Sequence, residues 1–226
     1  MKSLALLAAV ALLPALLVAQ DKKDAGAGPV VTIPFFGNEM CGYMPKKKAK
    51  QGLFVETSKG RVHVCCKDCV ADAKKDGEAA YAKSYKDTKK LDNRTCPVTG
   101  RELGAKPVVV EWQGHEVKVC CKDCVEPFKK NADRYLALMT DATVKDVGNV
   151  ICPVSGGAVD GGAVVVVDGE LVRVKGRHEA EQVRKDAAAH LAKAKASVKD
   201  AKKDGGDGKD GKGKPGENPA KKAHGG

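Results

Sequence analysis

The sequence predicts an α+β protein built from small tandem modules, each a turn, a β-hairpin and a helix, followed by a helical and then disordered tail. Cysteine-led segments recur at Cys41, Cys96 and Cys152, at spacings of 55 and 56 residues. Within these segments, strand-like alternation gives way to helical patterns. Only 4% of residues are aromatic, so we do not expect a single large core. Small modules with thin cores usually depend on a metal or on disulfides.

Residues 1–19 have the pattern of a secretory signal peptide. A lysine near the start is followed by an apolar run over residues 4–18 and by small residues suited to cleavage. A membrane anchor is the alternative, but the run contains Pro14 and is shorter than the ~20 residues that span a bilayer. We therefore expect an exported protein, periplasmic or secreted, with no membrane span after cleavage. A linker is expected over residues 20–37.

Two cysteine-rich repeats follow, at residues 38–90 and 91–146. In each, the first cysteine of a cysteine pair lies 24 positions after the opening cysteine, and both pairs stand in the string Val-Cys-Cys-Lys-Asp-Cys-Val. The predicted metal ligands are Cys41, Cys65, Cys66 and Cys69 in repeat 1, and Cys96, Cys120, Cys121 and Cys124 in repeat 2. This degree of repetition predicts that both repeats share one structure and one chemistry.

Repeat 2 shows the expected order of elements most clearly. Residues 96–100 (Cys-Pro-Val-Thr-Gly) indicate a tight turn. A β-branched stretch and its alternating partner predict a hairpin over 108–119. A helical pattern over 123–130 and a second helical turn around 135–139 complete the module. Cysteines are thus expected at the turn and at the junction between hairpin and helix.

Repeat 3, at residues 147–203, keeps this order but has lost its cysteine cluster. A hairpin is expected over 163–174, with a turn at Asp168-Gly169. Lys175 to His178 then stand where the cluster should begin, and one long helix is expected over about 179–203. Cys152 is left as a free thiol or as a partner for another chain. We therefore expect a degenerate repeat without a metal site.

The last segment, residues 204–226, is rich in Gly, Lys and Asp and contributes to the net charge of +11. It has too little apolar surface to offset its ordering entropy, so it is expected to be a disordered basic tail. Acidic residues are interleaved with the lysines, and aromatic residues that stack on bases are absent from it. We therefore expect a solvated spacer and no specific nucleic-acid partner.

Thiolates are soft ligands, so the eight cysteines of repeats 1 and 2 favour a thiophilic metal ion, most readily Zn²⁺ or Cu⁺. Structural disulfides are the alternative, because exported cysteines commonly oxidise. Neighbouring cysteines are awkward disulfide partners, which favours metal. On an extended segment, adjacent side chains point to opposite sides. Each site is therefore expected to have three credible ligands and an uncertain fourth.

Four other side chains near the cysteines carry atoms that can bind a soft metal ion. His63 and His115 lie at unmatched positions in the two repeats and are expected to be surface side chains. Met40 and Met44 flank Cys41 and could soften a copper site, although packing in the core or turn is the commoner role of methionine.

The two repeats also resemble the YHS and TRASH families. The resemblance covers residues 38–86 and 94–140 and is carried by the 96–100 string, the hairpin ending in Val-Lys-Val-Cys-Cys, and Cys124, Phe128, Asn131, Tyr135 and Leu136. It implies small treble-clef-like domains linked to heavy-metal sensing, trafficking and resistance. The TRASH pattern falls on Cys96, Cys120 and Cys124, and on Cys41, Cys65 and Cys69. The additional Cys66 and Cys121 depart from it, and repeat 1 lacks the Pro-Val-Thr-Gly opening.

The sequence thus favours an exported binding protein for a thiophilic ion that acts in buffering, trafficking or sensing. The alternative is a structural or interaction protein whose modules are held by structural zinc or disulfides. An enzyme is not expected, because no catalytic triad, phosphate-binding loop or paired-carboxylate pattern is recognisable. The Cys-x-x-Cys spacing permits a dithiol redox role, but the βαβ context of thioredoxin-like enzymes is missing.

Overall fold

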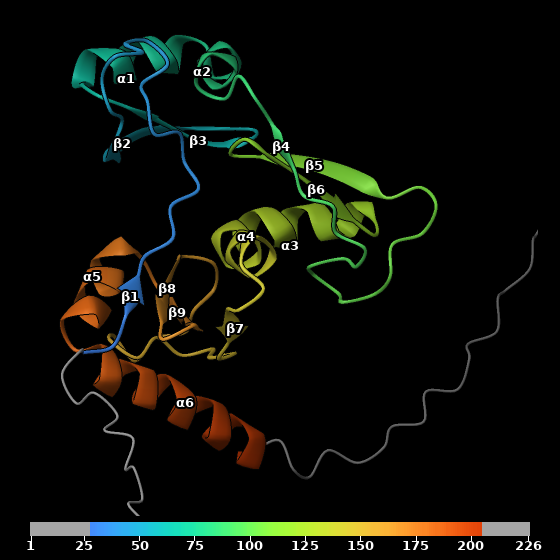
Figure 1. The fold of residues 1–226 in the computed structure, drawn as a ribbon, viewed down its shortest axis with the longest axis vertical. Coiled ribbons are helices and arrows are strands. Elements are labelled where there is room, and N and C mark those ends of the chain that lie inside the picture. Colours follow the sequence, from blue (N-terminus) through green and yellow to red (C-terminus); the bar gives the residue numbers. More distant parts are fainter. Residues whose placement is uncertain (1–27, 205–226) are drawn as a thin grey trace, which may run out of the picture.

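The computed structural model describes residues 28–204, which form an α+β chain of three modules. Each module contains an antiparallel hairpin followed by two or three helical segments. Figure 1 shows module 1 at the top, module 3 at the bottom and module 2 beside them on the right. The predicted signal peptide and all but the first residue of the predicted tail lie outside the described residues.

The hairpins occur where the sequence predicts them in modules 2 and 3. The strands are β2 (Lys50–Thr57) and β3 (Gly60–Val64) in module 1, β5 (Val108–Trp112) and β6 (His115–Val119) in module 2, and β8 (Ala163–Val167) and β9 (Glu170–Val174) in module 3. The turns of modules 2 and 3 have positive φ at both central residues, Gln113-Gly114 and Asp168-Gly169. That geometry matches the type I′ turn, whose twist suits a tight hairpin.

Each hairpin leads into helices that are interrupted once. They are α1 (Lys67–Lys75) and α2 (Gly77–Ser84) in module 1, the 3₁₀ turn η1 (Lys122–Cys124), α3 (Val125–Lys130) and α4 (Ala132–Thr140) in module 2, and α5 (Arg177–Lys185) and α6 (Ala187–Asp204) in module 3. The prediction of a single long helix in repeat 3 was wrong, because the chain leaves helical geometry at Asp186. The Asp186 carboxylate accepts a hydrogen bond from the Ala189 N–H (3.4 Å), so the residue starts a new helix.

Three two-residue strands pair with hairpins of later modules, so the observed module boundaries differ from the predicted repeat boundaries. They are β1 (Val31–Thr32), β4 (Lys89–Lys90) and β7 (Lys145–Asp146). β1 lies within the predicted linker but pairs antiparallel with β8 of module 3. β4 and β7 end predicted repeats 1 and 2, yet each runs parallel to the second hairpin strand of the following module. Two residues are too short to show a strand period, which is why the sequence pattern missed them.

Each module has its own apolar cluster, and each cluster includes its opening cysteine: Cys41, Cys96 or Cys152. A small fourth cluster joins module 2 to module 3, where Ala137 of α4 packs against Val164 and Leu171. In Figure 1 the segment after β1 runs from module 3 past module 2 to module 1. No helix among the described residues is long and apolar enough to cross a membrane.

Candidate metal centres

The opening cysteine of every module lies at a backbone turn, which is the same in modules 2 and 3 and one residue longer in module 1. The N–H groups of Cys41, Cys96 and Cys152 donate to carbonyl oxygens five or six residues later, at 3.0, 2.8 and 2.8 Å. In modules 2 and 3 a glycine four residues after the cysteine closes the turn with φ of 70°. Only glycine adopts that conformation without steric cost, which explains the Gly that ends both Cys-Pro-Val-Thr/Ser-Gly strings.

The other cysteines stand where the hairpin passes into the first helix. Cys66 occupies the N-cap position of α1, with Cys65 just before it, and Cys69 lies in the first turn. Module 2 repeats this arrangement, with Cys121 at the start of η1 and Cys124 at its end. The free N–H groups of a helix start favour negative charge, so the segment suits thiolates.

The fold brings six of the eight predicted ligands into two triads. The sulfurs of Cys41, Cys65 and Cys69 all lie within 4.8 Å of one another, as do those of Cys96, Cys120 and Cys124. The Sγ atoms of Cys65 and Cys69 are 3.9 Å apart, and those of Cys120 and Cys124 are 3.5 Å apart. Sulfurs about 2.3 Å from a tetrahedral Zn²⁺ are separated by about 3.8 Å, so the triads have the right size for one ion.

The second cysteine of each pair flanks its triad. Cys66 Sγ lies 3.2 Å from Cys69 Sγ, and Cys121 Sγ lies 3.2 Å from Cys124 Sγ. Both flanking thiols are half-exposed, whereas Cys69 and Cys124 are buried. All nine cysteines are free thiols in the structure. The first cysteine of each pair belongs to the triad, buried as Cys65 and half-buried as Cys120, and the second is a half-buried thiol beside it.

The opening cysteine carries the most easily formed thiolate of each triad. Burial by itself would raise the pKa of Cys96, but hydrogen bonds from the Cys120 backbone and from the side chain and backbone of Thr99 outweigh it and lower the pKa to about 6. Burial likewise opposes deprotonation of Cys41, and backbone hydrogen bonds from Cys65 and Met44 lower its pKa.

The helix cysteine of each triad behaves in the opposite way. Burial and the contact with Cys66 raise the pKa of Cys69. The contact with Cys121, followed by burial, raises the pKa of Cys124. In each triad a thiol with a lowered pKa thus lies beside one with a raised pKa. Binding an ion would release the thiol protons and neutralise the thiolate charge.

An asparagine three residues before each opening cysteine holds the turn against the hairpin, and the sequence analysis missed it. Asn38, Asn93 and Asn149 each donate from Nδ2 to a carbonyl before the cysteine (2.7–2.8 Å) and to a carbonyl of the second hairpin strand (2.7–2.8 Å). Each Oδ1 accepts the N–H of that same strand residue, at 2.8–3.1 Å. The signal was available, because all three repeats read Asn-x-x-Cys.

Module 3 keeps the turn without the triad. Cys152 is fully buried, and hydrogen bonds from Ser155 lower the pKa of its thiol against the effect of burial. Lys175 and Glu179 occupy the positions of Cys120 and Cys124. Within the part of the chain that the structure describes, grouped metal-ligand side chains occur only in the triads of modules 1 and 2.

The histidines and Met44 near the triads do not lie where the sequence predicts them. His63 is buried rather than on the surface, with its ring 5.0 Å from Phe35 and 5.6 Å from Phe54, and this burial lowers its pKa. His115 is half-buried. The Met44 side chain is 39% exposed, yet its sulfur lies 3.6 Å from Cys65 Sγ.

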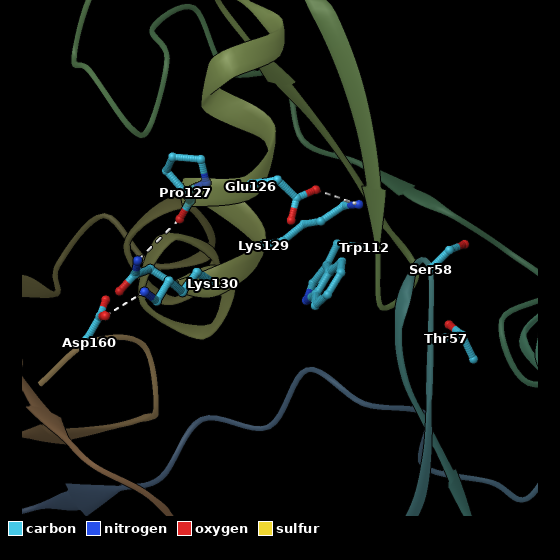
Figure 2. A pocket seen from close by; sticks show the side chains of 9 residues that line it. Thr57, Ser58, Trp112, Glu126, Pro127, Lys129, Lys130 and Asp160 are labelled. Atoms are coloured by element: carbon cyan, nitrogen blue, oxygen red, sulfur yellow. Dashed lines mark hydrogen bonds and ion pairs between the residues drawn. The ribbon is translucent and has the colours of Figure 1, made fainter.

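A groove of about 750 Å³ lies between the module 1 hairpin turn and α3, away from the triads. Figure 2 shows the Trp112 ring beside it, with Lys129 paired to Glu126 and Lys130 paired to Asp160. Its lysines are neutralised by these acids, and its lining contains no cysteine or histidine. The groove therefore offers neither a thiophilic metal site nor a clear anion site.

Comparisons with family models, with curated proteins and with solved structures each found no match to the chain.

Proposed function

We propose that this protein is an exported binding protein for a thiophilic metal ion, acting in buffering, trafficking or sensing. The observation that carries the proposal is the pair of cysteine triads, each with its sulfurs within 4.8 Å of one another, at equivalent places in modules 1 and 2. Three thiolates converging at this distance form a soft donor set suited to Zn²⁺, Cu⁺ or heavier ions.

The flanking thiols favour exchange of the ion over permanent storage. Cys66 and Cys121 are half-exposed and lie 3.2 Å from a buried triad sulfur. An ion could pass from a buried thiolate to the exposed neighbour and from there to an acceptor, one sulfur at a time. A closed structural site has no need of a thiol at the surface beside it.

Other parts of the proposal rest on the sequence. The resemblance to the YHS and TRASH families supports treble-clef-like modules and a role in metal handling. The signal-peptide pattern of residues 1–19 supports export to a periplasm or the cell exterior. We also propose that the protein is not an enzyme and has no specific nucleic-acid partner.

A structural role for the metal is the second candidate, and one observation favours it. Cys41, Cys65 and Cys69 belong to the apolar cluster of module 1, beside Val62 and Val64. An ion bound there would join the turn, hairpin and helix of a module whose core is otherwise small. Metal binding would then contribute directly to folding, as in structural zinc sites.

The first test measures metal content and free thiols together on protein purified from the exported fraction. We expect two equivalents of metal and thiols that the metal protects from alkylation. Cys124→Ala should remove one equivalent and Cys69→Ala the other, whereas Cys152→Ala is the matched control and should leave both. Protein without metal and with eight cysteines in disulfides would refute the proposal.

A second test separates handling of the ion from a structural role. Loaded protein is mixed with a competing chelator, and release of the ion is followed together with far-ultraviolet circular dichroism. Release within minutes, with the fold retained, is expected of a carrier or buffer. Release only upon unfolding would identify the metal as structural.

A further inference from the structure

The two triads have identical cysteines but differ in the side chain that lies over their exposed edge. Met44 and Thr99 each come three residues after the opening cysteine. Met44 Sδ lies 3.6 Å from Cys65 Sγ in module 1. In module 2 the corresponding atom is Thr99 Oγ1, which lies 3.5 Å from Cys120 Sγ. The same position beside the same triad sulfur is thus occupied by a thioether in one module and by a hydroxyl in the other.

Met44 is not a buried core residue. It is 39% exposed, too much for a core side chain, and it meets the module 1 apolar cluster through its sulfur, at Cys65. Met139, by contrast, packs against the module 2 cluster, as methionine usually does. The Met44 sulfur contacts Cys65, a triad cysteine that is only 6% exposed.

The two neighbours have different chemistry toward a bound ion. A thioether is neutral, needs no deprotonation and is a soft donor that suits Cu⁺. The Thr99 hydroxyl is a hard, weak donor that can instead hydrogen-bond to a thiolate. Arg101 Nη2 lies 3.9 Å from the same Cys120 sulfur. Apart from the flanking thiol of Cys121, whose counterpart in module 1 is Cys66, the neighbours of Cys120 are therefore hydrogen-bonding groups and include no thioether.

We propose that module 1 is the tighter Cu⁺ site of the two, because the Met44 thioether acts as a soft donor beside Cys41, Cys65 and Cys69. This inference rests on the proposed metal-binding function and adds selectivity to it. The two modules then bind Cu⁺ with different affinities rather than with equal ones. Zn²⁺, for which a thioether is a poor ligand, gains little from Met44.

The test is a competition titration of reduced, metal-free protein against a chromogenic Cu⁺ chelator under anaerobic conditions. Wild type should show two Cu⁺ affinities. Met44→Leu keeps the side-chain size and removes the sulfur, and it should weaken the tighter affinity by about tenfold. Thr99→Met should strengthen the weaker affinity. Met40→Leu is the matched control, since Met40 is similarly exposed beside Cys41, and should change neither.

Zn²⁺ titrations and a direct signal from the methionines complete the design. Met44→Leu should leave both Zn²⁺ affinities within about twofold, because only a soft ligand has been lost. In protein labelled with ¹³C at the methionine methyls, the first equivalent of Cu⁺ should shift the Met44 signal and leave that of Met139 in place.

The possible failures are distinguishable. Two equal Cu⁺ affinities in wild type, or an unchanged tight affinity in Met44→Leu, would overturn the selectivity while leaving the proposed metal-binding function intact. Wild-type protein that binds neither Cu⁺ nor Zn²⁺ would overturn both. Circular dichroism of each variant shows whether a lost affinity reflects a lost fold.

Discussion

Single residues determine how each triad is charged before an ion arrives. The pKa of Cys96 is lowered to about 6, against an ordinary value of about 8.5. The metal-free, reduced protein should therefore show a thiolate titration near pH 6 when its ultraviolet absorbance is measured against pH. Cys96→Ser should lack this titration. Because the folded pKa is lowered, the unfolded chain binds more protons between about pH 6 and 8.5.

This difference in proton binding between the folded and unfolded chain fixes the sign of the pH dependence of stability. The contribution of Cys96 to the free energy of unfolding is fully present above about pH 8.5 and is lost as the pH falls through about 6. Urea unfolding of wild type and Cys96→Ser should therefore diverge as the pH rises across that window. Parallel stabilities at all pH values would contradict the assignment.

The asparagine before each opening cysteine stabilises a turn rather than a ligand. Asn93→Ala removes three hydrogen bonds and leaves backbone groups of the turn and of β6 without partners, which should cost about 1–3 kcal/mol in the free energy of unfolding. It should also weaken metal binding to module 2, because Cys96 follows this turn. Denaturant unfolding and a metal titration measure the two effects.

The equivalent change in module 3 is the control. Asn149 makes the same three hydrogen bonds and is fully buried, but its module has no triad. Asn149→Ala should therefore lower stability and leave the metal content unchanged. Loss of metal from Asn149→Ala would show that the asparagines act globally rather than on their own turn.

At the scale of elements, the hairpin turns differ in what surrounds them. Gly114 and Gly169 have similar φ values of 71° and 78°. A Cβ at Gly169 would have ordinary contacts, whereas a Cβ at Gly114 would lie 2.6 Å from Cδ1 of Tyr85 in module 1. Gly169→Ala should cost about 1–2 kcal/mol for its left-handed backbone, and Gly114→Ala should cost more.

Thermal unfolding of the two glycine variants compares them directly. Tyr85 also donates its hydroxyl hydrogen to the Arg61 carbonyl (2.7 Å) and accepts the Asn38 N–H (3.1 Å), so displacing its ring would disturb module 1 as well. Equal destabilisation by both changes would show that the module 1–module 2 contact adds nothing to the backbone cost.

At the scale of the whole molecule, the modules are joined by small apolar contacts. Leu171 is fully buried in the cluster with Ala137 and Val164 that connects modules 2 and 3. Leu171→Ala should cost about 2–5 kcal/mol. It should also separate one unfolding transition into two, with metal still bound to modules 1 and 2. A single, merely earlier transition in calorimetry would contradict this role of the cluster.

Much of each module could be predicted because its signals are local. The hairpins of modules 2 and 3 follow from β-branched alternation and turn glycines, and the eight candidate cysteines follow from the repeated cysteine spacing. The two-residue strands and the break at Asp186 could not be predicted in the same way. They depend on pairing with distant segments or on one capping side chain within an alanine-rich run.

The sequence alone determined that two repeats carry matching thiols and that the third does not. Tertiary structure decided which sulfurs converge: Cys65 and Cys120 join the triads, while Cys66 and Cys121 flank them at the surface. It also placed the Met44 sulfur beside Cys65. Sequence spacing fixes how far apart residues are along the chain, but the direction of a side chain depends on how the turn packs against the end of the hairpin.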